Sequence, residues 1–196
     1  MAYNYQYVRD HTPADYVFPT HRLKRTCDPN RTPLVLVACG SCFDVIGGYL
    51  SPVSDSYKKT GLAPAHHRVR MCELAVESTT KWLMVDPWEA EKDTYVPTAN
   101  VLDHFHYHFN HVMGGVECSD GSRKPVRIVL LAGADLIQTI GEPGKWDPRD
   151  VAHILGDYGV FILERTGTDL KAALETLNQW EKNIHVIRQH QTKTTV

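Results

Sequence analysis

The stretch PLVLVACGSCFDVIGGYLSPV, residues 33–53, decides how this chain folds. Two apolar runs, residues 34–38 and 45–49, flank a short segment that contains Gly40 and Ser41. Each run is typical of a buried strand. A parallel neighbour requires a crossover of about a dozen residues or more, whereas an antiparallel hairpin requires only about two. The stretch is therefore either a hairpin or a β-α-β unit that lacks its helix.

The composition is that of a globular protein. Of 196 residues, 42% are apolar and 22% charged, and the formal net charge is -2. This length suits one domain with a sizeable core. The charge gives no general attraction to nucleic acid or to anionic membranes, and no window approaches the roughly 18 apolar residues of a membrane span. We expect an intracellular protein with neither nucleic acid nor membrane as a partner.

The cysteines are odd in number and scattered, which favours reduced thiols over a disulfide framework. Cys39 and Cys42 spell C-x-x-C, so redox or metal chemistry is an alternative at this pair. A β-branched run follows Cys42 where a redox motif has a helix, and no second C-x-x-C completes a zinc site. We expect core thiols. The five cysteines are Cys27, Cys39, Cys42, Cys72 and Cys118.

Strand and helix patterns alternate after an N-terminal arm. Residues 1–32 have no apolar periodicity and predict an extended or poorly ordered arm. Residues 126–132 form a continuous apolar run that stops at Gly133, as expected of a strand buried on both faces. The alternation predicts an α/β fold with a parallel sheet and ligands at the carboxyl ends of the strands. Further strands are expected at residues 82–85, 158–163 and 184–187, and helices at residues 64–76, 98–113, 148–156 and 170–180.

The order of the motifs is more specific than any one of them. LVLVACGS, GGYLSPVSDSYKKTGLAPAHHRVRMCELA, WLMVDPWE, LLAGADL, KWDPRDVAHILGDYGVFILERTG and NIHVI follow one another along residues 33–188. This series resembles the eukaryotic nicotinamide-mononucleotide adenylyltransferases. The resemblance implies a nucleotidyltransferase domain over residues 33–196 with a Rossmann-like fold. It implies transfer of AMP from ATP to nicotinamide mononucleotide with Mg²⁺, giving NAD and pyrophosphate, in the nucleus or cytoplasm.

The resemblance also implies residues that contact the nucleotide phosphates, ribose and adenine. Gly40 and Ser41 resemble the pair that opens the phosphate loop, and free backbone N–H groups after a strand suit a phosphate. Gly133 and Asp135 resemble the glycine and acid that contact the adenosine ribose and the nicotinamide nucleotide. Arg165 resembles an arginine near the adenine-nucleotide pocket.

A second group would contact the nicotinamide nucleotide. Lys59 resembles the lysine that approaches its phosphate. Trp146 resembles the aromatic residue that stacks on the nicotinamide ring, Tyr95 takes the place of the opposite aromatic, and Thr98 is its neighbour. The resemblance leaves open whether nicotinamide or nicotinate mononucleotide is preferred. It also leaves open whether the chain forms a homo-oligomer.

Two departures from the family pattern bear on catalysis. The family's first loop reads G-S-F-x-P-x-T-x-x-H-L and continues through a helix, whereas here Ser41 is followed within two residues by Phe43. The pattern therefore predicts a β-α-β unit without its helix, and no catalytic histidine can be assigned. The signature I-S-S-T-K-x-R is also absent after Ile187. We expect an adenylyltransferase with impaired turnover; the alternatives are a non-catalytic nicotinamide-nucleotide-binding protein and an inactive splice or gene-model fragment.

A histidine-rich stretch offers a last alternative. In DHFHYHFNH, His104, His108 and His111 would share a helix face, which makes metal binding conceivable. No carboxylate or cysteine is spaced to complete the set. We therefore expect no metal site.

Overall fold

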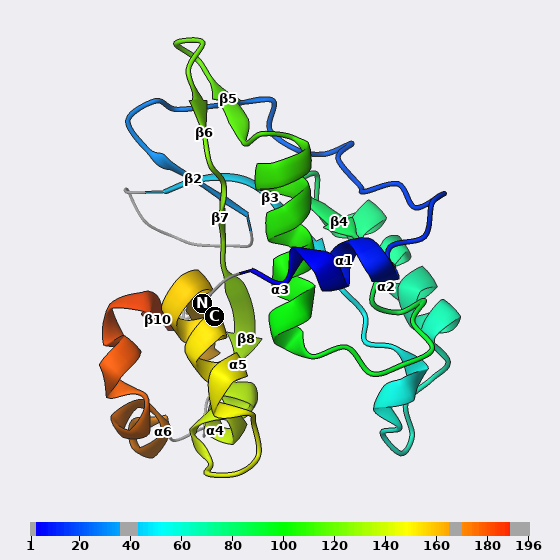
Figure 1. Cartoon of the computed structure of the whole chain (residues 1–196), viewed down its shortest axis with the longest axis vertical. Coiled ribbons are helices and arrows are strands. Elements are labelled where there is room, and N and C mark those ends of the chain that lie inside the picture. Colours follow the sequence, from blue (N-terminus) through cyan, green and yellow to red (C-terminus); the bar gives the residue numbers. More distant parts are fainter. Residues whose placement is uncertain (1–2, 36–42, 165–169, 189–196) are drawn as a thin grey trace, which may run out of the picture. The chain divides into compact units, whose positions relative to one another are not determined.

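The computed structural model describes residues 3–35, 43–164 and 170–188. The chain divides into two compact units, Met1–Ile128 and Val129–Val196, each with a parallel sheet of its own (Figure 1). No helix in the described residues is long and apolar enough to cross a bilayer.

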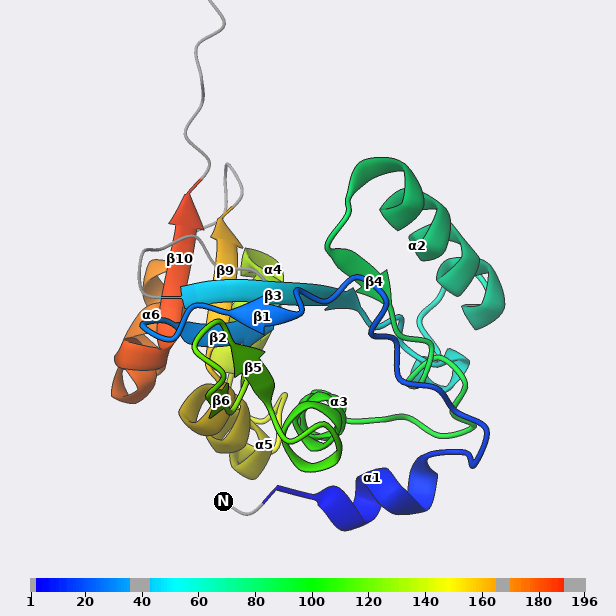
Figure 2. The same ribbon diagram turned by 90° about the horizontal axis from the view of Figure 1, so that it is seen from above.

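The main sheet of the first unit has four parallel strands in the order β4-β3-β2-β7. Their apolar side chains, among them those of Leu34, Ile46, Met84 and Ile128, are buried. Figure 2 shows α2 and α3 on opposite sides of this sheet. The strands are β2 (Thr32–Val35), β3 (Phe43–Leu50), β4 (Leu83–Val85) and β7 (Arg127–Ile128).

The two opening strands are parallel neighbours. Thr32 pairs with Phe43 and Leu34 with Val45, after which the register shifts so that Val35 faces Gly47. The parallel prediction is therefore confirmed and the hairpin reading is wrong. The seven residues 36–42 that join the strands are fewer than the usual crossover of about a dozen.

Three helices accompany this sheet. The expected helix after Pro64 is α2 (Ala65–Thr79), and the helix expected over residues 98–113 is α3 (Thr98–His106), which continues as the π-helix η2 (Tyr107–Val112). Apolar side chains of α3 and η2, including those of Leu102, Phe105 and Phe109, are buried. Packing of this apolar face, more than intrinsic propensity, stabilises a helix of such length.

The N-terminal segment contains more regular structure than its sequence indicates. It forms α1 (Tyr5–His11) and β1 (Thr26–Cys27), and Val8 is fully buried. Strand β1 pairs in parallel with β5 (Val116–Cys118), which pairs antiparallel with β6 (Arg123–Lys124). The expectation of a poorly ordered arm is wrong for these parts, because tertiary contacts such as Asn4 N–H to Asp103 Oδ2, 2.8 Å, stabilise elements too short to show periodicity.

The second unit has a three-stranded parallel sheet in the order β10-β9-β8. Its strands are β8 (Leu130–Gly133), β9 (Val160–Glu164) and β10 (Ile184–Arg188); β9 and β10 lie close to the predicted positions, whereas in β8 only Ala132 is buried, so the prediction of a strand buried on both faces is wrong there. The apolar run of residues 126–132 is divided between β7 and β8, so it serves two sheets. The helices are α4 (Ala134–Gly141), α5 (Pro148–His153), α6 (Lys171–Thr176), the π-helix η3 (Ile154–Tyr158) and the 3₁₀-helix η4 (Asn178–Asn183).

Local signals fix the start of α5 but not its end. Asp147 caps the helix, its carboxylate accepting from the backbone N–H of Arg149 at 2.8 Å, and Pro148 occupies the first turn as predicted. The predicted end at Gly156 is wrong: the helical chain continues through η3 and stops at Gly159, whose φ of 86° suits glycine. Both units have parallel strands with flanking helices, which is the predicted Rossmann-like α/β architecture.

Candidate functional site

In the first unit, the predicted nicotinamide-side residues lie on loops that follow β3 and β4. These strands are parallel neighbours, so both loops leave the same edge of the sheet. After β3 the chain forms the short 3₁₀-helix η1 (Asp55–Tyr57), and Lys58 then adopts a left-handed conformation with φ 51°. This turn exposes the side chain of Lys59.

Hydrogen bonds fasten the two loops to each other. The Ser56 hydroxyl donates to the carbonyl oxygen of Asp93 at 2.6 Å, and the hydroxyl of the buried Ser54 donates to that of Thr94 at 3.3 Å. Each serine thereby satisfies a carbonyl that a loop would otherwise leave to water. The loop that carries Lys59 is thus held beside the loop that carries Tyr95.

Two aromatic rings stack across this junction. The rings of Tyr57 and Tyr95 have centroids 5.9 Å apart and an interplanar angle of 25°. The side chains are 49% and 48% exposed, so the rings present a planar surface to solvent. Thr98 begins α3 three residues after Tyr95, where backbone N–H groups of a helix are free of intrahelical partners. The structure therefore brings together an aromatic platform, a lysine and a helix start.

Charge contacts hold the first loop against α2. The Arg68 guanidinium donates to Asp55 Oδ1 at 2.9 Å and to the carbonyl of Ala63 at 2.7 Å. The pKa of Asp55 is lowered, first by the backbone N–H of Ala65 and then by Arg68. A single arginine therefore fixes η1 relative to the start of α2.

A buried carboxyl group supports the same edge. The Ser51 hydroxyl donates to Glu89 Oε2 at 2.9 Å, and burial raises the pKa of Glu89 to about 7, with a smaller contribution from Asp86. Trp88, next to it, is fully buried. The positions of Trp88 and Glu89 agree with a structural role for this pair of residues.

Of the histidines in this helix, His104 belongs to the core, whereas His111 is exposed. His104 is fully buried, with Nε2 3.0 Å from Asp86 Oδ2, while the Tyr16 hydroxyl donates to Asp86 Oδ1 at 2.7 Å. The His104 ring also stacks on Trp88, with centroids 4.2 Å apart. Burial lowers the pKa of His104, and burial followed by His104 lowers that of His108 to about 4. Within the described ranges no group of three metal-ligating side chains occurs.

In the second unit, Gly133 and Asp135 lie where β8 passes into α4. Gly133 is the N-cap of α4, and Asp135 stands in its first turn. A Cβ atom at Gly133 would lie 2.5 Å from Asp135 Oδ1, so the carboxylate folds back over the glycine backbone. A larger residue at Gly133 would displace this carboxylate.

Trp146 belongs to the same neighbourhood. Its indole N–H donates to the hydroxyl of Thr139 at 3.2 Å. Thr139 is one turn after Asp135 on α4, and residues four apart share a helix face. Gly133 and Asp135 thus lie at the start of α4, and Trp146 contacts its last turn.

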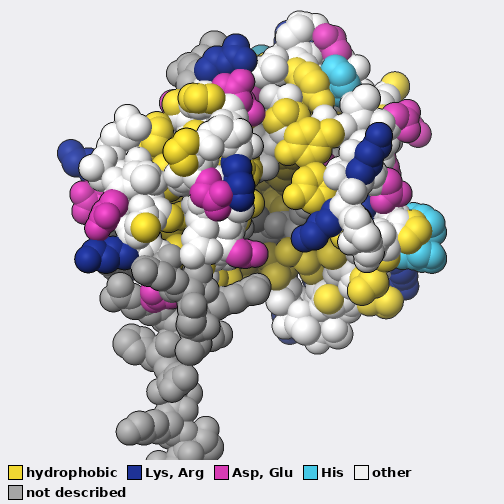
Figure 3. All heavy atoms as spheres, turned by 90° about the horizontal axis from the view of Figure 1, so that it is seen from below, with side chains coloured by type: hydrophobic (Ala, Val, Ile, Leu, Met, Phe, Trp, Pro, Cys, Tyr) yellow, Lys and Arg dark blue, Asp and Glu magenta, His cyan; other side chains and the backbone are white. Residues whose placement is uncertain are grey.

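Other predicted residues lie outside the described residues: Gly40, Ser41 and Arg165, and with them Cys39 and Cys42. The roles assigned to all nine site residues stay predictions. Basic and acidic side chains lie interspersed over the face shown in Figure 3, in keeping with the net charge of -2.

Comparison with known proteins places these observations in a family. The profile of the cytidylyltransferase-like family matches residues 42–194, which include β3 and all the described candidate residues. The chain belongs to the cytidylyltransferase-like family. The predicted nucleotidyltransferase superfamily is thereby confirmed.

Several relatives of this cytidylyltransferase-like chain are named nicotinamide/nicotinic acid mononucleotide adenylyltransferases. One from Saccharomyces cerevisiae is 48% identical over 89% of this chain and 50% of its own length. One from Schizosaccharomyces pombe is 46% identical over 89% of this chain and 55% of its own. One from Bos taurus is 30% identical over 81% of this chain and 75% of its own. The chain spans about half the length of the two yeast proteins.

Tyr57 is the residue of this cytidylyltransferase-like site that sequence reasoning missed. The loop SPVSDSYKKTG drew attention through its lysines, although it also contains an aromatic residue just before them. An exposed aromatic residue beside a lysine pair in a loop at the carboxyl edge is a usable signal for a planar, anionic ligand. Sequence alone could not show that Tyr57 faces Tyr95, because the contact crosses from one loop to another.

Proposed function

We propose that this chain binds nicotinamide mononucleotide and ATP and joins them to NAD with release of pyrophosphate. The observation that carries the proposal is the fastened pair of loops, which holds the Tyr57 and Tyr95 rings beside the lysine loop. A pyridinium ring on an aromatic face gains about 0.5–2 kcal/mol. The names of the relatives support the same substrates.

Each candidate site residue has a role in this proposal. Lys59 pairs with the phosphate of nicotinamide mononucleotide, Tyr95 and Trp146 take its ring, and Thr98 assists from the start of α3. Asp135, over the backbone of Gly133, accepts from ribose hydroxyls, since an ionised carboxylate only accepts. Gly40, Ser41 and Arg165 contact the ATP side.

The reaction is a displacement at phosphorus. A phosphate oxygen of nicotinamide mononucleotide attacks the α-phosphorus of ATP, and pyrophosphate leaves. Catalysis of such transfers consists mainly of positioning and charge stabilisation. Mg²⁺, bound with ATP, would neutralise phosphate charge; it is commonly held by one or two carboxylates together with substrate phosphates, so no larger cluster of protein ligands is required. The proposal includes an intracellular location, in the nucleus or cytoplasm, where both substrates occur.

A second candidate is binding of nicotinamide mononucleotide without turnover. It is favoured by the short link of residues 36–42, which leaves little chain for a phosphate loop and helix. The two candidates make the same prediction for binding and opposite predictions for NAD formation.

The test combines binding and turnover. We expect nicotinamide mononucleotide to quench tryptophan fluorescence, and Trp146→Ala or Tyr95→Ala to weaken binding by about 2–30-fold. Trp82→Phe, on an exposed ring away from these loops, is the control and should leave affinity unchanged. NAD formation with ATP and Mg²⁺ supports the enzyme; binding without NAD supports the second candidate. Unaltered affinity in both aromatic variants would refute the site.

A further inference from the structure

Two cysteines occupy paired positions on neighbouring strands. Cys27, the last residue of β1, lies directly opposite Cys118, the last residue of β5, in a parallel register. Both side chains are buried, with 2% and 1% of their surface exposed, and both are free thiols. Neighbouring strands lie about 5 Å apart, within the Cα separation of about 4.4–6.8 Å that a disulfide spans.

The two thiols interact with each other. The pKa of Cys27 is raised to about 11, first by burial and then by the neighbouring thiol of Cys118. Asp44 raises this pKa further and Lys124 lowers it. The surroundings of Cys27 therefore disfavour its thiolate in the folded chain.

We propose that Cys27 and Cys118 are an oxidative modification site, which forms a reversible disulfide. Directly opposed residues of parallel strands hold their Cβ atoms farther apart than the preferred 3.8 Å or so, which strains the bond. Strained disulfides have higher reduction potentials and are the labile ones. Both cysteines end strands of two and three residues, so little regular structure opposes the adjustment.

The oxidant is a low-molecular-weight disulfide such as oxidised glutathione. One cysteine thiolate attacks a glutathione sulfur, breaking the S–S bond and releasing one glutathione thiolate. The other cysteine thiolate attacks the resulting mixed disulfide at the protein sulfur and releases the second. Two protein thiols are oxidised, one disulfide is reduced, and the two thiol protons pass to the released glutathiones. Since burial disfavours the thiolate, the reaction proceeds through local opening of these short strands.

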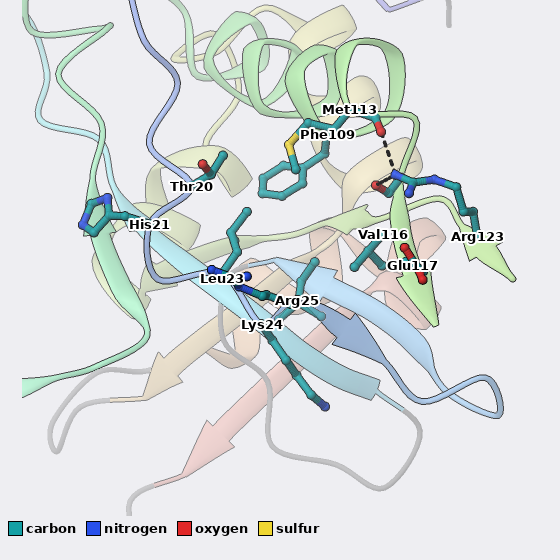
Figure 4. A pocket seen from close by; sticks show the side chains of 12 residues that line it. Thr20, His21, Leu23, Lys24, Arg25, Phe109, Met113, Val116, Glu117 and Arg123 are labelled. Carbon is teal, nitrogen blue, oxygen red and sulfur yellow. Dashed lines mark hydrogen bonds between the residues drawn. The ribbon is translucent and has the colours of Figure 1, made fainter. Parts of the chain in front are cut away.

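The disulfide would join two segments of the chain that line a cavity. A cavity of about 400 Å³ in the first unit has residues 20–21 and 23–25 on one side and Met113, Val116 and Glu117 on the other. Figure 4 shows Leu23 directed toward Phe109 and Met113 across it. Cys27 and Cys118 follow these two walls in the sequence, so a bond between them ties the N-terminal segment to β5.

The test is peptide mass spectrometry of the intact chain after incubation with oxidised glutathione, without reduction. We expect a Cys27–Cys118 cross-linked peptide, lighter than its two parts by two hydrogens, that disappears on treatment with dithiothreitol. Cys118→Ser should abolish it, whereas Cys72→Ser, at a half-buried thiol elsewhere, should not. The Tm of the oxidised chain should exceed that of the reduced chain.

The proposal is also tested in a variant in which Cys39, Cys42 and Cys72 are serine, so that only the pair remains. If that variant does not fold, the peptide map of the natural chain decides. If Cys27 and Cys118 both still react with an alkylating reagent after oxidation and denaturation, the proposal is overturned. So would glutathione retained on one cysteine with the other free, because the sulfurs would then fail to reach each other.

Discussion

At the scale of single residues, Glu89 links pH to stability. Its pKa is about 7 in the folded chain against an ordinary 4.5, so the folded state holds the extra proton between these values. The free energy of unfolding should therefore fall as pH rises from about 4.5 to about 7 and stay level above. The loss is on the order of 2–3 kcal/mol. Glu89→Gln, which keeps an acceptor for Ser51, should remove this dependence.

Urea denaturation at about pH 5 and about pH 8 measures this effect. The variant should gain stability over the natural chain at the higher pH and show little gain at the lower one. Glu91→Gln, at an exposed carboxyl group two residues on, is the matched control. Equal pH profiles for the natural chain and Glu89→Gln would contradict the assignment.

At the scale of elements, Tyr16 fastens the N-terminal segment to α3 and to the loop after β4. Its hydroxyl donates to Asp86 and lies 3.1 Å from His104 Nε2. Tyr16→Phe should lower the free energy of unfolding by about 1–3 kcal/mol, because a buried carboxylate loses a donor. Chemical denaturation measures it. Tyr57→Phe, at an exposed ring, should change stability by less than about 0.5 kcal/mol; an equal loss in both variants would contradict this prediction.

The elements also show what a sequence can predict. Apolar runs located β9 and β10, and the pair Asp147-Pro148 located the start of α5, because those signals are local. The stack of Tyr57 on Tyr95, the helix α1 and the pairing of β1 with β5 were not predictable, since each depends on residues distant in sequence. The environment of His104 was not predictable for the same reason: only the fold shows that Asp86 and Trp88 lie against its ring.

At the scale of the whole molecule, the connection between β2 and β3 limits catalysis in the proposed function. Inserting a helix-bearing crossover between Ser41 and Phe43 should raise the rate of NAD formation at least about tenfold, because one lost phosphate donor alone costs about 10²–10³ in rate. A Gly/Ser insert of equal length is the control and should give no gain. Turnover by the natural chain equal to that of the helical insert would show that the short connection suffices.

The residues of the candidate site are divided between the two units of the chain. The predicted residues Lys59, Tyr95 and Thr98 lie in one unit and Gly133, Asp135 and Trp146 in the other; Gly133 and Asp135 lie directly at a strand end, whereas Trp146 follows α4. The sequence could not show the fastening of each group, because the serine and threonine hydroxyls that hold the loops form common hydrogen bonds with no motif of their own.

Arg22 stabilises the end of a helix that lies far from it in the sequence, so this helix could not be transferred to another protein without Arg22. Its Nη1 donates to the carbonyls of Val76, Thr80 and Leu83 at 3.2, 3.1 and 3.0 Å, at the end of α2 and in β4. The helix is thus closed by a cation from far upstream and not by a glycine of its own. The β3-α2-β4 segment therefore depends on Arg22: in another scaffold without this residue, the carbonyls of Val76, Thr80 and Leu83 would lose this donor, and the helix would fray from that end.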